Sequence, residues 1–240
     1  MMKSGQIVVI GDSHIGLTDR SELPVIAWLN RLASTRPSAL YLNGDVFHYL
    51  IADRKFYTPA VEAVFARMKE LRDDGVAIHY VEGNRDFFLD GSFVEDAVTD
   101  IGLEYAVQAG ARKYLIVHGD MINDRDLPYR FWRRLSKNAV SRFALRLIPR
   151  RVARAFVDRV EKRLADSNFK HKSRLPVELM EAYGRKRRAE GFNVVVFGHF
   201  HHKTELDIDG GRVTVLPAWY ESGEAMVIDP DNGDYRFEII

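Results

Sequence analysis

The chain has 240 residues, of which 46% are hydrophobic and 11% aromatic, so it can bury a sizeable core and is not an intrinsically disordered protein. It has no cysteine, which excludes disulfides, thiolate-bound zinc, iron–sulfur clusters and cysteine nucleophiles. The net charge of +1 conceals an asymmetry, because 20 of the 35 Lys and Arg residues but only 7 of the 34 Asp and Glu residues lie between positions 125 and 190.

The first apolar run, Ile7–Ile10, is too short for the core of a signal peptide, and we expect it to form a buried strand. No apolar run approaches the roughly 20 residues needed to span a bilayer. We therefore expect a cytoplasmic protein, whose membrane contact, if it has any, is peripheral and at the inner membrane.

Five strand-like apolar runs along the chain each end in a polar cluster. They are Ile7–Ile10, Ala39–Leu42, Ala77–Val81, Tyr114–Val117 and Val194–Phe197. Helical patterns at 23–34 and 58–73 separate the first three, and strands that alternate with helices predict an α/β fold with a largely parallel, buried sheet. Sites in such sheets lie beyond the carboxyl ends of the strands, where the polar clusters are. Further strands are expected at 212–216, 225–228 and 235–240.

Residues 125–190 form a basic segment between the fourth and fifth of these units. Large apolar residues recur there at roughly helical spacing with arginines between them, and Pro149 interrupts the pattern, so we expect at least two helices. We predict one domain over residues 1–240, with 125–190 inserted as a helical lid. Its apolar face could meet lipid chains while Arg and Lys meet phosphates or an anionic membrane surface. The alternative is a solvated helical hairpin without a ligand.

The polar clusters contain side chains that bind metal ions. Asp12 and His14 are separated by one residue, so both can point to one side of an extended turn, and His199 and His201 have the same spacing. Asp45 has two carboxylate oxygens and could bridge two cations. We predict two divalent cations, because oxygen and nitrogen ligands without thiolate suit Mn²⁺, Fe²⁺ or Zn²⁺ better than Ca²⁺, and Mn²⁺ is the metal that we expect. The predicted ligands are Asp12, His14, Asp45, Asn84, His118, His199 and His201.

The ordered motifs resemble the five signatures of calcineurin-like metallophosphoesterases. They are Asp12-Ser13-His14, Gly44-Asp45, Gly83-Asn84-Arg85-Asp86, His118-Gly119-Asp120 and Gly198-His199-Phe200-His201. The resemblance implies two mixed β-sheets packed face to face and flanked by helices, with the metals at the strand ends. It also implies that one metal is held by Asp12, His14, Asp45 and His201. The other would be held by Asp45, Asn84, His118 and His199.

A narrower resemblance comes from the run Gly83–Leu89, which has Arg85 where most of the superfamily has histidine. This run is similar to the UDP-2,3-diacylglucosamine diphosphatases of lipid A synthesis, as are the basic insertion and the run Ala218–Gly223. The resemblance implies cleavage of a nucleotide-linked lipid into UMP and 2,3-diacylglucosamine 1-phosphate, under insertion helices that cover the acyl chains. The chain departs from that family at His48 and Tyr49, where an acidic residue and a nearby tryptophan are usual.

Arg85 is permanently protonated, so it cannot act as a general acid, but it can form charge-assisted bonds to phosphate oxygens. With the resemblance, this predicts catalytic roles for Asn84, Arg85 and His118. The predicted substrate-binding residues are Arg85, Asp126, Tyr129, Ser167, Lys170, Lys172 and His199.

Two other functions remain open from the sequence. The chain could hydrolyse another nucleoside diphosphate or a phosphodiester, and a nuclease belongs here because the basic segment could hold a phosphate backbone. Nucleic acid is disfavoured, because the arginines alternate with large apolar residues. A non-catalytic scaffold that binds a membrane or a protein is the third hypothesis. The sequence does not set the native metal, the acyl-chain length or the oligomeric state.

Overall fold

The computed structural model describes residues 4–90, 93–153, 155, 159 and 175–239. The strands are β1 Ile7–Ile10, β2 Ala39–Asn43, β3 Leu50–Ile51, β4 Ala77–Val81, β5 Asp86–Phe87, β6 Asp100–Gly102, β7 Glu104–Ala109, β8 Arg112–Val117, β9 Val194–Phe197, β10 Thr204–Ile208, β11 Gly211–Val215, β12 Glu224–Ile228 and β13 Tyr235–Ile239. The helices are α1 Glu22–Thr35, α2 Pro59–Asp73, α3 Leu127–Ser136, α4 Ala139–Arg146, α6 Val177–Ala189 and the short α7 Trp219–Ser222, with a 3₁₀ turn at Arg54–Phe56.

The strands form two main sheets and one short pair. The first sheet has the order β13-β12-β1-β2-β4-β6, and the second has the order β10-β11-β9-β8-β7. Strands β1, β2, β4 and β6 are parallel, as are β11, β9 and β8, while antiparallel strands lie at three of the four sheet edges. The α/β fold with two mixed sheets is confirmed, and the predicted parallel order holds inside each sheet.

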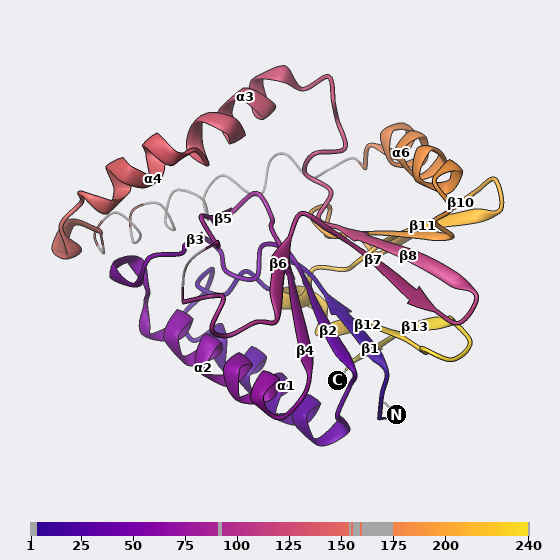
Figure 1. Cartoon of the computed structure of the whole chain (residues 1–240), viewed down its shortest axis with the longest axis horizontal. Coiled ribbons are helices and arrows are strands. Elements are labelled where there is room, and N and C mark those ends of the chain that lie inside the picture. Colours follow the sequence, from indigo (N-terminus) through magenta and orange to yellow (C-terminus); the bar gives the residue numbers. More distant parts are fainter. Residues whose placement is uncertain (1–3, 91–92, 154, 156–158, 160–174, 240) are drawn as a thin grey trace.

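Alternating side chains of the strands bury two faces of the first sheet. Val8 and Leu40 face the core shared with α1 and α2, whereas Val9 and Tyr41 face a core shared with Ile116 and other residues of the second sheet. A third core lies between the second sheet and α6. Figure 1 shows these layers, with α1 and α2 below the first sheet and α6 outside the second. The carboxyl ends of the parallel strands in the two sheets lie close together.

Local sequence accounts for the main helix in the first half. Thr58 caps α2, because its Oγ1 accepts a hydrogen bond from the Val61 N–H at 3.4 Å, and Pro59 occupies the first turn, where its missing N–H leaves no bond unmade. The helix ends before Gly75, which has a φ of +98°. The predicted span 58–73 is therefore confirmed.

Five strands lie outside the predicted set. β6 and β7 extend the sheets beside β4 and β8, and β10 forms a hairpin with β11. The Asp209-Gly210 turn of that hairpin is a recognisable signal, since Asp-Gly pairs favour the two-residue turns that join antiparallel strands. The other two are β3 and β5, which have two residues each and pair only with each other. Such short strands carry too few residues for a periodic pattern.

The predicted insertion divides into two parts in space. Helices α3 and α4 cross over the carboxyl ends of the strands, as Figure 1 shows. Helix α6 instead covers the second sheet, and its Gly184 is buried so closely that an added Cβ would lie 2.5 Å from Val213. The boundaries 125–190 of an inserted lid stay a prediction. None of the helices in the described part of the chain is long and apolar enough to cross a membrane.

The stability of the first layer should depend on Trp28. This side chain is fully buried on α1 and lies edge-on to Trp219, with ring centroids 5.8 Å apart. We expect Trp28→Ala to lower the free energy of unfolding by about 3–5 kcal/mol, because it removes a large buried side chain and leaves a cavity. Urea denaturation measures this. Leu23→Ala on the same helix, where the side chain is 51% exposed, should change it by less than about 0.5 kcal/mol; equal losses in both would contradict the prediction.

Candidate metal centre

The loops that follow β1, β2, β8 and β9 are joined by backbone hydrogen bonds. The Asp12 N–H donates to Gly44 O at 3.2 Å and the His14 N–H donates to Asp45 O at 3.2 Å. In the second sheet, the Gly198 N–H donates to His118 O at 3.0 Å. These bonds align the ends of neighbouring strands, so polar side chains distant in sequence converge at one place.

The first convergent group consists of Asp12, His14 and His201. Nε2 of His201 lies 3.0 Å from Asp12 Oδ1 and 3.2 Å from His14 Nε2, and His14 Nε2 lies 3.7 Å from the same Asp12 oxygen. Three potential ligand atoms thus surround one point, and all lie within 4.8 Å of one another.

The second convergent group consists of Asp45, His118 and His199, whose ligand atoms also lie within 4.8 Å of one another. Nε2 of His118 lies 3.7 Å from Asp45 Oδ2 and 3.2 Å from Asn84 Oδ1. All seven predicted ligands therefore lie in this centre. Their role in binding metal stays a prediction.

Backbone groups fix the orientation of these ligands. The His118 ring places Nδ1 2.9 Å from Asn43 O, which favours the tautomer that donates from Nδ1 and leaves Nε2 free to bind a cation. The His199 N–H donates to Asp12 Oδ2 at 2.7 Å, so the other oxygen of Asp12 points toward His201.

Asp86 supports the second group from behind. Its Oδ2 accepts from the Gly83 N–H at 2.8 Å and from the Asp45 N–H at 3.1 Å, and its Oδ1 accepts from Tyr80 at 3.0 Å. All of these groups are buried. Asp86 thereby holds the two loops that carry Asp45 and Asn84 against each other.

Five ligand positions have left-handed backbone, which is uncommon for residues other than glycine. The φ angles are 53° at Asp12, 44° at His14, 49° at Asp45, 62° at His199 and 63° at His201. Backbone strain of this kind is found at functional sites, where the surrounding structure holds residues in an unfavourable conformation. This backbone conformation could not be predicted from the sequence, because no residue pattern marks an aspartate or a histidine for it.

Glycine is required beside Asp45. A Cβ at Gly83 would lie 2.3 Å from Asp45 Oδ1, and a Cβ at Gly44 would lie 2.4 Å from His118 Nδ1. Any larger residue would have to displace a predicted ligand.

The electrostatics keep both carboxylates ionised. Burial raises the pKa of Asp12, but His201, His118 and His14 together outweigh burial and hold the pKa well below its usual range. In the same way, burial raises the pKa of Asp45, and the charge of His118 and its hydrogen bond bring that pKa well below the ordinary value.

The imidazoles respond in two directions. Burial lowers the pKa of His14 to about 3 and, with the charge of His118, lowers the pKa of His199 to about 4, so both are neutral. Burial also lowers the pKa of His118, but Asp45 and other carboxylates outweigh it and raise the value to about 10. Because the nearby carboxylates stabilise the protonated form of His118, they also favour positive charge at this place.

These observations fit two divalent cations. Ionised carboxylates and neutral imidazoles are the forms that bind metal, and an amide oxygen completes a mixed set without thiolate. The side chains of the first group would hold one cation and those of the second group, with Asn84, the other.

Arg85 lies beside the second group. Its Nε is 3.4 Å from Asp45 Oδ2, its Nη1 donates to His48 O at 3.1 Å, and the residue is 8% exposed. His48 is fully buried, and its ring lies 5.6 Å from that of His14, so this departure from the narrower family adds an imidazole near the centre. Tyr49 packs against Phe87.

Helix α3 is tied to the rim of the centre by charge. Arg133 donates to Glu82 Oε1 at 2.8 Å and to Asp120 Oδ2 at 3.2 Å, and Lys137 donates to Glu82 Oε1 at 2.7 Å. Tyr129 donates a short hydrogen bond to Asp120, whose charge and hydrogen bond add to burial in raising the Tyr129 pKa.

The predicted substrate-binding residues have different positions. Tyr129 lies at the rim, whereas Asp126 caps α3 by accepting from the Tyr129 N–H at 3.0 Å. Ser167, Lys170 and Lys172 lie outside the described residues. Their contact with a substrate stays a prediction.

Tyr220 is a residue of the centre that the sequence analysis did not single out as a site residue. Its ring centroid lies 5.4 Å from that of His14 and 5.9 Å from that of His201. The residue is 39% exposed, so it forms an accessible aromatic wall beside the first group. Its place in the run Ala218–Gly223, already part of the narrower resemblance, was the signal that could have identified it.

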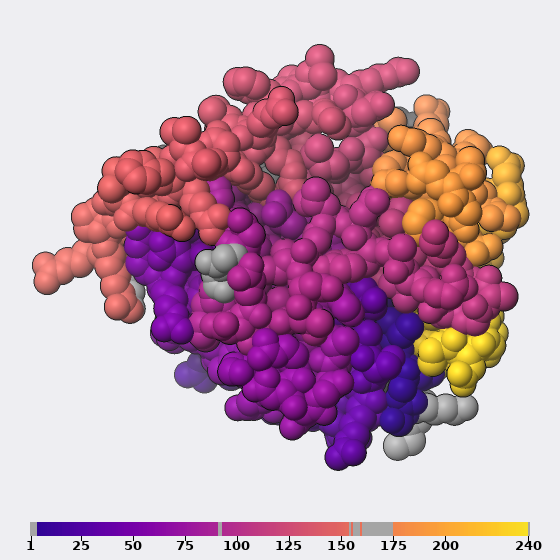
Figure 2. All heavy atoms as spheres, in the orientation of Figure 1, coloured from indigo at the N-terminus to yellow at the C-terminus, as the bar shows by residue number. Residues whose placement is uncertain are grey.

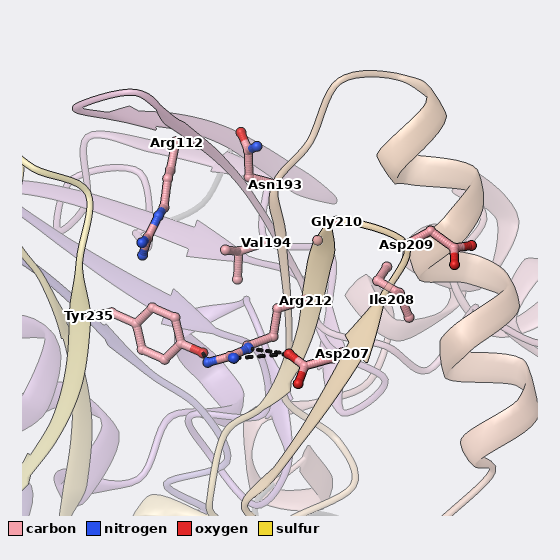
Figure 3. A pocket seen from close by; sticks show the side chains of 10 residues that line it. Arg112, Asn193, Val194, Asp207, Ile208, Asp209, Gly210, Arg212 and Tyr235 are labelled. Carbon is pink, nitrogen blue, oxygen red and sulfur yellow. Dashed lines mark hydrogen bonds and ion pairs between the residues drawn. The ribbon is translucent and has the colours of Figure 1, made fainter.

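A separate cavity of about 520 Å³ lies at the opposite end of the second sheet. It is lined by Arg112 and Val194, which begin β8 and β9, and by Arg212 of β11. Figure 3 shows Arg212 paired with Asp207 there. None of the seven predicted ligands lines this cavity, so it is distinct from the metal centre.

Curated relatives match nearly the whole chain. A UDP-2,3-diacylglucosamine hydrolase of Pseudomonas putida is 32% identical over 233 residues, which cover 93% of this chain and 95% of that protein. A protein of the same name from Stutzerimonas stutzeri is 32% identical over 245 residues, which cover 96% of this chain and 97% of that protein. Another, from Aeromonas salmonicida, is 29% identical over 238 residues, which cover 95% of this chain and 91% of that protein.

Solved structures share the fold. A hypothetical protein from Pyrococcus horikoshii OT3 superposes with a TM-score of 0.52 at 10% identity, covering 97% of this chain and 86% of that one. The profile of the family described as Calcineurin-like phosphoesterase matches residues 5–203. The chain therefore belongs to the calcineurin-like phosphoesterase family and is a metal-dependent hydrolase.

Proposed function

We propose that this hydrolase cleaves the diphosphate of UDP-2,3-diacylglucosamine to UMP and 2,3-diacylglucosamine 1-phosphate, with Mn²⁺ as the expected metal. The observation that supports the proposal most directly is Arg85 in contact with Asp45 at a centre of seven metal-binding side chains. The relatives that carry this substrate in their name span almost the full chain.

When bound, two divalent cations supply the positive charge that ionises a water and offsets charge on phosphoryl oxygens. The water oxygen adds to one phosphorus, the anhydride P–O bond breaks, and the sugar phosphate leaves as an anion. This leaving group needs little protonation, which fits a permanently charged arginine at position 85 in place of a histidine.

The protein groups orient the reactants. Asn43 O keeps the His118 ring in one tautomer, and Asp86 holds the loops that carry Asp45 and Asn84. Arg85, fixed by Asp45 and by His48 O, presents its guanidinium where a phosphate oxygen beside the cations can accept from it. Asp12, Asp45 and His118 are buried, so bulk water does not compete for these groups.

We further propose that α3 and α4 dock on the anionic surface of the inner membrane of a cytoplasmic enzyme. The two helices expose large apolar side chains, including Leu127, Phe131, Trp132, Leu135, Val140 and Phe143. Figure 2 shows these helices as an arm along one side of the molecule. Arginines lie between the apolar residues, and this combination fits a membrane interface with anionic lipids. A lipid substrate would enter from that surface.

The substrate assignment can be tested with purified protein. In the presence of Mn²⁺ it should release UMP from UDP-2,3-diacylglucosamine, and a chelator should stop the reaction. Asp45→Ala should lower kcat by at least about 10²–10³-fold, because it removes a buried carboxylate that would hold a cation. Chromatographic detection of UMP measures turnover. Release of UMP from UDP-glucose but not from the lipid would favour the other nucleoside-diphosphate substrates, and no turnover with any divalent metal would exclude the proposal.

The close packing at Gly83 gives a second prediction. We expect Gly83→Ala to weaken Mn²⁺ binding and activity by about 10–100-fold, since the new methyl group displaces the Asp45 carboxylate. Gly191→Ala is a matched control, because no atom lies within 4 Å of its added Cβ, although its φ of +95° should reduce stability. Calorimetric titration with MnCl₂ compares the two. Native metal affinity in Gly83→Ala would show that the carboxylate is not held as described.

Membrane docking predicts a charge-dependent association. Native protein should co-sediment with vesicles that contain phosphatidylglycerol and much less with neutral phosphatidylcholine vesicles. Phe131→Glu should reduce binding by at least about tenfold, because burying an aromatic side chain of this size contributes about 1.5–3 kcal/mol. Leu23→Glu, at an exposed position on α1, is the control and should bind as the native protein does. Equal binding by both variants would contradict docking through α3.

A further inference from the structure

A cavity of about 270 Å³ lies beside the metal centre, between α3, α6 and the edges of the two sheets. Leu103, Val117, Met121, Ile122 and Tyr183 form its apolar walls. Its charged lining residues are Glu82, Glu104, Asp120, Arg133 and Arg187. The cavity is too small and too charged at its rim for a pair of acyl chains, but its size suits a single heterocycle with a sugar.

The cavity adjoins the reacting groups through short stretches of chain. Glu82 lies two residues before Asn84, and Asp120 lies two residues after His118. Arg133 connects the two sides, because it donates to Asp120 Oδ2 at 3.2 Å and to Gly83 O at 3.4 Å. A ligand whose phosphate lies at the metal centre can therefore place its next group in the cavity.

The rim of the cavity is rich in hydrogen-bond acceptors. Bonds among the described residues engage Oε1 of Glu82, Oδ2 of Asp120 and Oε2 of Glu104. In the described parts of the chain no hydrogen bond engages the second oxygen of these carboxylates, so it can accept from a ligand. Carboxylates bind ribose hydroxyls in nucleotide sites, and they repel phosphate. A neutral nucleoside therefore suits this rim, with its phosphate outside.

The opposite side of the centre has a different character. Under α4, an apolar cluster joins the body to the insertion through Ile51, Phe56, Phe88 and Ala153. Figure 1 shows α4, β3 and β5 on one side of the centre and α6 on the other. The two sides thus match the two ends of a nucleotide-linked lipid, apolar beneath α4 and acceptor-rich beside α6.

We propose that the cavity beside Tyr183 binds the nucleoside of the leaving nucleotide. The base lies against the apolar walls and Tyr183, and the ribose hydroxyls and the base N–H donate to the carboxylates of the rim. This deepens the proposed function and rests on it for the identity of the nucleoside as uridine.

Leu103 offers a clean way to block the cavity, because it lines the cavity and is itself 63% exposed, so a larger side chain there leaves the core intact. The control is Leu23→Trp, the same substitution at an exposed position of α1. Calorimetric titrations of Mn²⁺-loaded native and variant proteins with UMP, inorganic phosphate and glucosamine 1-phosphate compare the three ligands.

The expected result is that native protein and Leu23→Trp bind UMP more tightly than inorganic phosphate. In Leu103→Trp the affinity for UMP should fall about tenfold, because the variant loses the contribution of one stacked base. The affinity for inorganic phosphate should not change. Unchanged UMP affinity in Leu103→Trp would overturn the proposal, as would a loss seen for glucosamine 1-phosphate but not for UMP.

The test separates the cavity from the reaction. If the native protein fails to hydrolyse the lipid substrate while Leu103→Trp still loses UMP affinity, the proposed function is wrong and the nucleoside site stands. If lipid hydrolysis proceeds while UMP binds equally to native protein and both variants, only the nucleoside site is wrong.

Discussion

The central constraint on this structure is the burial of two ionised carboxylates, Asp12 and Asp45, between the sheets. Isolated buried charge is unfavourable, so the carboxylates require positive charge close by. The imidazole of His118, whose pKa is raised, and the guanidinium of Arg85 supply part of it within the protein. The remainder fits cations, and the loops that end five separate strands are shaped by the need to surround them.

Much of this arrangement followed from the sequence. Strands such as Ile7–Ile10 and Val194–Phe197 are continuous β-branched and apolar runs, and each ends in a cluster of ligand types, so both the parallel order and the seven side chains could be predicted. What escaped prediction depends on space: the left-handed backbone of the ligands, the aromatic wall of Tyr220, and edge strands such as β6 that have too few residues to show a period. The lysines expected to contact substrate lie outside the described residues.

Ion pairs and one apolar cluster link α3 and α4 to the body of the protein. Arg133 and Lys137 contact Glu82 and Asp120, while most apolar side chains of α3 and α4 are exposed. The side chains of Arg133 and Lys137 are only 12% and 10% exposed, so removing one partner of these ion pairs would leave a largely buried charge without its counter-charge. The ion pairs of α3 and the apolar cluster beneath α4 therefore hold both helices against the body of the protein.

The same organisation explains where the molecule tolerates strain. Five ligands have left-handed backbone, and this strain opposes folding by about 1–3 kcal/mol at each position. The two buried carboxylates oppose folding as well. Three apolar cores, one on each outer face and one between the sheets, hold the strands whose ends carry those ligands. Because the strand ends are fixed from both sides, relaxing one loop would disrupt packing in two layers. The cores therefore maintain a geometry that the ligands themselves would not adopt.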